Sequence, residues 1–169
     1  MIHLYTGDGK GKTTAAIGLA VRAAGCGMPV IFAQFMKGRD TGELHILQDM
    51  KNVQLMRSVQ DFGFYSSMSD EDKEKLTEIH NCILDNILGI VNSGRCFLVV
   101  LDEITYPVKW GLLDVEKLKK LLTCEGLELV CTGRDAAPFL QEAADYITEM
   151  KCVRHPFEKG VAARRGVEY

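Results

Sequence analysis

A glycine-rich loop at residues 6–14 directly follows a short apolar stretch, Ile2 to Tyr5, that is typical of a β-strand. The loop reads Thr-Gly-Asp-Gly-Lys-Gly-Lys-Thr-Thr, and its three glycines allow backbone N–H groups to turn inward around phosphate oxygens. Lys12 would supply a positive charge, and the hydroxyl of Thr13 could join a Mg²⁺ shell. The first glycine comes one residue late for the G-x-x-x-x-G-K-S/T pattern, so the loop is a variant. The sequence thus predicts a nucleoside triphosphate as ligand and a helix whose positive end faces its phosphates.

A second motif is an apolar run that ends in two carboxylates. Residues 97–101 read Phe-Leu-Val-Val-Leu, and Asp102 and Glu103 follow. Such a run is typical of a buried parallel strand that delivers acids to the carboxyl edge of a sheet, where they can hold Mg²⁺ or its waters. In isolation, a core strand ending in two solvated acids would be the better interpretation. Together with Lys12 and Thr13, the run favours a metal–nucleotide site.

Strand-like and helix-like segments alternate along the chain without a linker, a repeat or a low-complexity tract. Ser69 and Asp72 form a capping box for the longest predicted helix, whose apolar residues recur at helical spacing up to Gly94. Asp114 can cap a further helix. The predicted strands are residues 2–5, 29–35, 53–57, 97–103, 127–132 and 146–150, and a short helix covers 138–144.

This alternation predicts an α/β fold of the P-loop NTPase-like type, with a mostly parallel sheet, helices on both faces and a single domain over residues 1–169. In such folds the ligand binds at the carboxyl ends of the strands. The phosphate loop, the pair Asp102 and Glu103, and the pair Gly133 and Arg134 all fall at that edge. We therefore expect one active site there.

Composition narrows the classes of partner. The formal net charge is −3, which gives no basic face and argues against nucleic acid as the main partner. No apolar run reaches membrane-spanning length, and the chain begins with a strand and a loop instead of a leader, so we expect a cytoplasmic protein without a membrane partner. The six cysteines are scattered without a C-x-x-C pair, which predicts mostly buried thiols and neither a zinc site nor a disulfide framework.

A phosphate loop with an acid-tipped strand serves kinases, ATPases, GTPases and alkyl-transferring enzymes alike, so physical reasoning leaves the reaction open. Several strings of this chain, in order, resemble the family of P-loop cob(I)alamin (corrinoid) adenosyltransferases. They are residues 5–16, 34–38 with 42–43, 99–106, 132–134, 144–150, 155–157, 160–161 and 163–169.

The resemblance implies that ATP is attacked at its ribose C5′ by the Co(I) ion of a corrinoid, either cobalamin or a precursor, with release of triphosphate. It implies ATP and corrinoid as substrates, Mg²⁺ as cofactor with Mn²⁺ as an alternative, a flavin-type electron donor protein as partner, and a homodimer. No phosphoryl group moves, and Co(I) carries no proton, so a general base is unnecessary.

Residue roles follow from the same resemblance. Thr13 and Glu103 would hold the metal, and Asp102 would support the metal shell. The implied catalytic residues are Lys12, Thr13, Glu103 and Phe64, and the corrinoid would contact Phe64 and Tyr65. The implied ATP-binding residues are Gly7, Asp8, Gly9, Lys10, Gly11, Lys12, Thr13, Thr14 and Arg134.

The chain departs from the family pattern in two places. Family members commonly carry a segment before the first strand that helps cover the active site, whereas this chain reaches its phosphate loop almost at once. The family's Gly-Phe-Thr-Trp stretch, which packs near the corrinoid and helps remove its lower axial ligand, is matched here by residues 63–66, Gly-Phe-Tyr-Ser. Phe64 would remain as the aromatic wedge, with Tyr65 as a substitute for the tryptophan. The alternative is a surface loop whose aromatic residues only cover the core. Trp110 could be a core, rim or dimer-contact residue.

Two rival functions remain from the motifs alone. Small-molecule kinases often close an arginine-bearing lid over the phosphates, but Arg39 stands alone in its loop. A nucleotide switch or partner-regulating ATPase is the other rival. Residues 132–135, Thr-Gly-Arg-Asp, superficially match a guanine-specifying box, but glycine replaces the lysine that would stack on the base, which disfavours GTP.

Overall fold

The computed structural model describes residues 1–168 and contains one six-stranded sheet, in the order β3-β2-β4-β5-β1-β6. Each neighbouring pair of strands is parallel. The strands are β1 (Ile2–Thr6), β2 (Val30–Gln34), β3 (Val53–Arg57), β4 (Leu98–Asp102), β5 (Glu128–Thr132) and β6 (Tyr146–Glu149). The predicted α/β fold with a parallel sheet is confirmed, and every strand lies within two residues of its predicted bounds.

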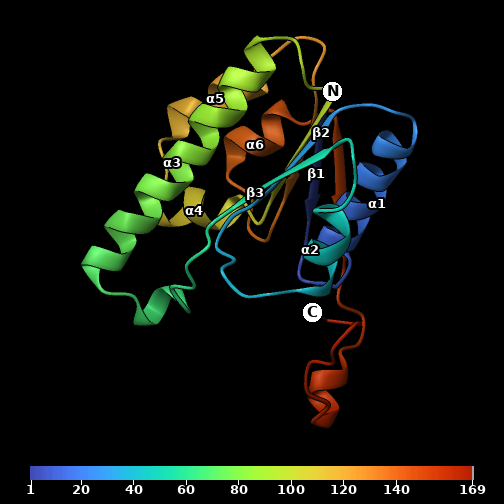
Figure 1. Ribbon diagram of the computed structural model, residues 1–169. Helices are drawn as coiled ribbons and strands as arrows, with labels where there is room; N and C mark the ends of the chain where they lie inside the picture. The colour runs from blue at the N-terminus through green and yellow to red at the C-terminus, as the bar shows by residue number, and fades with distance from the viewer. Residues whose placement is uncertain (169) are drawn as a thin grey trace.

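Helices cover both faces of the sheet. They are α1 (Lys12–Gly25), α2 (Gly42–Leu47), α3 (Asp70–Asn92), α4 (Thr105–Trp110), α5 (Val115–Leu122) and α6 (Pro138–Ala143), with 3₁₀ turns at Tyr65–Ser67 and Pro156–Lys159. Figure 1 shows α1 and α2 on one face and α3 with α4, α5 and α6 on the other. The buried core is divided in the same way, because one apolar cluster packs under α1 and a larger one under α3, α5 and α6.

The predicted caps of α3 and α5 are present. The Ser69 hydroxyl accepts the Asp72 backbone N–H at 3.1 Å, and the Asp72 carboxylate accepts the Ser69 N–H at 3.2 Å. The Asp114 carboxylate accepts the Glu116 N–H at 2.9 Å. Each contact satisfies a backbone donor that the first turn of a helix leaves free, so these helices begin at the predicted residues.

The expectation of mostly buried thiols is wrong. Cys131 is buried in β5, and burial raises the pKa of its thiol to about 12. Cys26 and Cys82 are exposed, because Cys26 stands at the open C-terminal end of α1 and Cys82 points away from the buried face of α3. Within residues 1–168, no helix is both long enough and apolar enough to cross a membrane.

One buried polar side chain joins α3 to two loops. His80 is 1% exposed, its Nδ1–H donates to the Leu112 carbonyl at 2.9 Å, and its Nε2 accepts the Met36 N–H at 3.4 Å. Burial lowers the pKa of this imidazole to about 4. His80 is therefore neutral in the folded protein, and it helps hold Met36 at a positive φ of 58°.

We expect the free energy of unfolding to fall as the pH drops from about 6.5 through 4, because the unfolded chain binds the proton of His80 first. The contribution of this histidine is complete above pH 6.5 and amounts to roughly 3 kcal/mol. Urea unfolding at a series of pH values measures it, with His80→Gln as the comparison protein, which should show a flatter profile in this window. Equal pH slopes for the two proteins would contradict the assignment.

Candidate active site

The phosphate loop joins β1 to α1 and rests on the end of β6. The Gly9 N–H donates to the Met150 carbonyl at 2.7 Å, and the Met150 N–H donates to the Thr6 carbonyl at 2.8 Å. Gly7 has a φ of +97°, and a Cβ there would collide with the Met150 carbonyl oxygen. The loop therefore needs glycine at this position, both for its backbone conformation and for close packing on its neighbour strand.

Lys12 is the first residue of α1, and its side chain turns back into the loop. The ammonium donates to the carbonyls of Gly7 and Gly9 at 2.8 and 2.7 Å. Burial lowers the pKa of Lys12 and nearby Arg134 lowers it further, whereas Glu103 raises it. The first turn of this 14-residue helix contains no acidic residue. The helix end and the lysine thus present positive charge to the same loop, as anion binding requires.

Asp102, the last residue of β4, is fully buried, and its two carboxylate oxygens accept three side-chain hydrogen bonds. The hydroxyls of Thr13 and Thr132 both donate to Oδ1, at 2.8 and 2.7 Å. Lys37 donates to Oδ2 at 2.7 Å. A buried carboxylate is tolerated because it is paired and fully hydrogen-bonded in this way. Asp102 therefore orients the residues around it.

Glu103 follows Asp102 and has a φ of +62°, an unusual backbone conformation for a residue with a side chain. Its N–H donates to the Thr132 hydroxyl at 2.9 Å, which holds this conformation. Burial, and then Asp102, raise the pKa of the Glu103 carboxyl, whereas Lys37 lowers it. Strained backbone of this kind clusters at functional sites.

A cavity of about 620 Å³ lies over the carboxyl edge of the sheet, a size that suits a nucleotide. It brings together seven of the predicted loop residues with Glu103 and Arg134, and it does not bring in Gly7, Asp102, Phe64 or Tyr65. Its lining residues are Asp8 to Thr14, Ile17, Lys37, Thr41, Gly42, Glu43, Glu103, Tyr106, Arg134, His155, Gly166, Val167 and Glu168.

The sequence assigned no site role to Lys37, Glu43 or Tyr106, although all three line the cavity. Lys37 comes three residues after the buried strand β2, which ends beside β4, so it could have been expected at the same sheet edge. The Arg57 guanidinium donates to the Lys37 carbonyl at 3.3 Å and to the Arg39 carbonyl at 2.7 Å, which fixes this segment. Lys37 adds a further cation close to Glu103.

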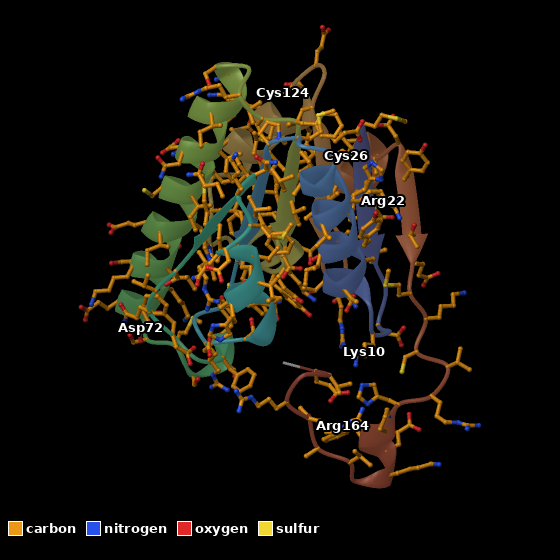
Figure 2. The ribbon with its side chains drawn as sticks, turned by 45° about the vertical axis from the view of Figure 1, so that its right-hand side comes forward. Lys10, Arg22, Cys26, Asp72, Cys124 and Arg164 are labelled. Carbon is orange, nitrogen blue, oxygen red and sulfur yellow. The ribbon has the colours of Figure 1, made fainter. Side chains whose placement is uncertain are left out.

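The C-terminal segment, residues 151–168, contributes a wall of the cavity. Lys10 in the phosphate loop donates to the Val167 carbonyl at 2.9 Å and to the Glu168 carboxylate at 3.3 Å. Figure 2 shows Lys10 at the end of the loop and Arg164 within the segment beneath it. Hydrogen bonds from Arg164 lower the pKa of the Glu168 carboxyl to about 2. This wall depends on chain segments more than 150 residues apart, and no local motif predicts it.

The aromatic loop (residues 62–67) meets the cavity segment at Lys37, which lines the cavity and also lines a smaller hollow together with Phe62 and Gly63. Phe64 is 74% exposed, and the Arg39 guanidinium lies 5.9 Å from the centre of its ring. Tyr65 and Phe62, in contrast, pack against a buried cluster. Phe64 therefore does not cover the core, whereas its neighbours Phe62 and Tyr65 do.

The side chains that could bind a metal ion at the carboxyl ends of the strands offer oxygen atoms. Within residues 1–168, no three His, Cys, Asp or Glu residues are grouped as a metal site. The Glu103 carboxylate and the Thr13 hydroxyl are among the oxygen donors that line the cavity, together with Asp8 and Glu43, and Asp102 lies behind Thr13. This set fits Mg²⁺ or Mn²⁺, which prefer oxygen ligands and, for Mg²⁺, usually need only one or two carboxylates beside substrate phosphates.

Comparisons with known proteins identify the family. The family model described as ATP:corrinoid adenosyltransferase BtuR/CobO/CobP matches residues 1–169. The corrinoid adenosyltransferase of Pseudomonas aeruginosa is 34% identical over all of this chain, which covers 83% of that protein. The corrinoid adenosyltransferase of Escherichia coli K12 is 32% identical over all of this chain, with 85% of that protein covered.

A solved structure supports the fold. The KaiC-like protein PH0186 of Pyrococcus horikoshii superposes with a TM-score of 0.56 at 16% identity, over 89% of this chain and 70% of that one. Identity at this level carries information about the fold alone. The full-length family match and the relatives above 30% identity confirm the resemblance read from the motifs, and the chain belongs to the ATP:corrinoid adenosyltransferase family.

Proposed function

We propose that this family member transfers the 5′-deoxyadenosyl group of ATP to the Co(I) ion of a corrinoid and thereby takes part in adenosylcobalamin biosynthesis or salvage. The cobalt electron pair forms the Co–C bond to C5′, the C5′–O bond breaks, and its electron pair leaves with triphosphate. Cobalt is thereby oxidised formally from Co(I) to Co(III). The observation that carries this proposal is the match of the whole chain to the ATP:corrinoid adenosyltransferase family, and the cavity lined by Lys12, Lys37 and Arg134 supplies positive charge for the leaving triphosphate.

The three cations and the loop amides would act on the leaving group. Negative charge grows on the triphosphate as the C5′–O bond breaks, and positive groups already in place stabilise that charge without reorganisation. Lys12 is held inside the loop by two carbonyl contacts, and Lys37 is held by Asp102. Thr14 and the loop residues Gly7 to Gly11 would bind the other phosphate oxygens, and all of these except Gly7 line the same cavity.

Thr13 and Glu103 would hold Mg²⁺, or Mn²⁺ in its place. When bound, the metal ion neutralises phosphate oxygens and so assists departure of triphosphate. Asp102 would act behind these ligands, because its Oδ1 accepts the Thr13 hydroxyl and, through Thr132, is linked to the backbone of Glu103. Outer contacts of this type set the orientation of metal ligands.

The aromatic loop would serve the corrinoid. An axial ligand that donates electron density makes Co(II) difficult to reduce, so an apolar group that displaces this ligand makes Co(I) accessible to mild reductants. Phe64 is the candidate for this wedge because of the motif resemblance and because its ring is 74% exposed, and Tyr65 supports it. On the motif resemblance alone, we further propose a flavin-type electron donor protein, a homodimer, a cytoplasmic location and one domain over residues 1–169.

Product analysis tests the proposed reaction. Incubation with ATP, Mg²⁺ and chemically reduced corrinoid should give adenosylated corrinoid and triphosphate in equal amounts, with negligible ADP. The visible spectrum follows the corrinoid, and phosphorus NMR identifies the phosphate product. Release of ADP at a comparable rate without corrinoid would contradict the proposal and favour a kinase or an ATPase.

A further inference from the structure

Three aromatic rings form a stack between the nucleotide cavity and the aromatic loop. The ring centres of Trp110 and Tyr65 lie 4.4 Å apart, with their planes 7° from parallel. The ring centres of Trp110 and Tyr106 lie 5.1 Å apart, at 29°. Tyr106 lines the cavity, and Tyr65 is the neighbour of Phe64 in the loop. The stack therefore connects the wall of the cavity to the residue beside the proposed wedge.

Trp110 has a fixed position because it belongs to α4. This helix begins two residues after Glu103 and ends at Trp110, and Gly111, with a φ of +67°, caps it. Tyr106 and Trp110 are four residues apart, so they are neighbours on one face of the helix. Tyr65 and Trp110 also pack on one buried cluster, which consists of Met68, Leu76 and Leu112. Two rings of the stack thus belong to α4, the helix that directly follows Glu103 at the end of β4.

Phe64 depends on its neighbours for its direction. Among the described residues, its exposed ring makes one cation–π contact, with the Arg39 guanidinium. Its carbonyl accepts the Ser67 N–H at 2.9 Å and the Ser67 hydroxyl at 2.8 Å, which close the single turn that begins at Tyr65. The Lys73 ammonium lies 5.4 Å from the centre of the Tyr65 ring. Tyr65 is therefore one of the side chains that attach this turn to the protein body, together with Phe62 before it and the buried Met68 after it.

We propose that Trp110 is a positioning residue, which holds Tyr65 by stacking and thereby directs Phe64 toward the corrinoid. The inference rests on the role proposed above for Phe64. Trp110 itself touches neither the cavity nor the exposed face of Phe64, so it acts through Tyr65. A free Tyr65 ring would allow the turn, and Phe64 with it, to take other orientations.

The stack can be observed without any activity measurement. Trp110 is the only tryptophan of the chain, so tryptophan emission reports on this ring alone. Tyr65→Leu removes the stacked face and should shift the emission maximum to longer wavelength as water reaches the indole. An unchanged emission spectrum in Tyr65→Leu would show that the two rings do not stack in solution, and the inference would fail.

The kinetic test compares two assays. In the first, a flavin-type reductant must generate Co(I) on the enzyme, and in the second, Co(I) is supplied by strong chemical reduction. Trp110→Leu should lower the first rate about tenfold, because the free energy of one stacked aromatic pair corresponds to at most about that factor. It should change the second rate much less. Trp110→Tyr should restore most of the first rate because a second aromatic ring can stack on Tyr65.

Leu112→Ala serves as the matched control, since Leu112 belongs to the same buried cluster but leaves the stack in place. It should lower the melting temperature without changing the ratio of the two rates. Equal losses in both assays for Trp110→Leu, or the same ratio as in Leu112→Ala, would overturn the inference and leave Trp110 as a packing residue.

Phe64→Ala separates this inference from the proposal on which it rests. If Phe64→Ala slows both assays equally or neither, the wedge role fails and the positioning role fails with it. If Phe64→Ala shows the contrast between the assays and Trp110→Leu does not, the wedge role stands and only the positioning role is wrong.

Discussion

Replacing Lys12 by alanine is expected to lower the turnover of ATP and Co(I) corrinoid by a factor of about one hundred or more, comparable to the loss of one preorganised charge donor in other active sites. The ammonium is buried in the phosphate loop between two carbonyls, where it meets the triphosphate as negative charge grows on it. Single-turnover rates at saturating ATP and Mg²⁺ measure the effect. They exclude a simple loss of nucleotide affinity.

Lys109→Ala is the matched control for that experiment. Lys109 makes a close ion pair with Asp135, at 2.8 Å, and it lies outside the cavity. Its replacement should leave turnover near that of the natural protein, because exposed ion pairs contribute little. If Lys12→Ala turned over normally under saturating conditions, the reaction would have to take place away from this loop.

Replacing Phe64 by alanine is expected to have the second largest effect, and only in one assay. Adenosylation should slow strongly when a flavin-type reductant must generate Co(I) on the enzyme, and much less when Co(I) is supplied chemically. Because the ring is 74% exposed, its loss should change the free energy of unfolding by no more than about 0.5 kcal/mol. Parallel rate measurements and thermal unfolding of one preparation check all three points.

Phe62→Ala controls for packing in the same loop. Phe62 is half-buried against the cluster beneath α4, so its truncation should lower the melting temperature and slow both assays together. If Phe64→Ala behaved like Phe62→Ala, with equal losses and reduced stability, the loop would have only a structural role and the axial-ligand step would need another explanation.

Local signals predicted most of the fold, because long elements carry a repeated pattern. The apolar period and capping box of α3 and the apolar run of β4 belong to contiguous residues. The helices α2 and α4 were not predicted. Each has six residues, which is too few to show a helical period of apolar residues. In addition, Pro107 normally indicates a helix break, but it lies in the first turn of α4, where a helix tolerates proline.

The sequence predicted only those site residues that belong to one contiguous motif. Successive strand residues point to opposite sides, so the strand pattern alone could not tell which of the two acids at the end of β4 would face the cavity. Only the family resemblance assigned Glu103 to the metal and Asp102 to a supporting role. Asp102 turns inward to Thr132 and Lys37, whereas Glu103 lines the cavity. The C-terminal wall escaped prediction because it reaches the site through tertiary packing, whereas Lys37 follows β2 at the same sheet edge and was predictable in principle.

The central claim is that carbon, and not phosphorus, is the atom under attack. ATP labelled with oxygen-18 at the bridging position between C5′ and the α-phosphorus tests this directly, with chemically reduced corrinoid as acceptor and mass spectrometry of the products. The account predicts that all of the label leaves in triphosphate and that the adenosylated corrinoid carries none. Label retained on the nucleoside would mean that a P–O bond had broken, and it would contradict the assignment of this cavity to adenosyl transfer.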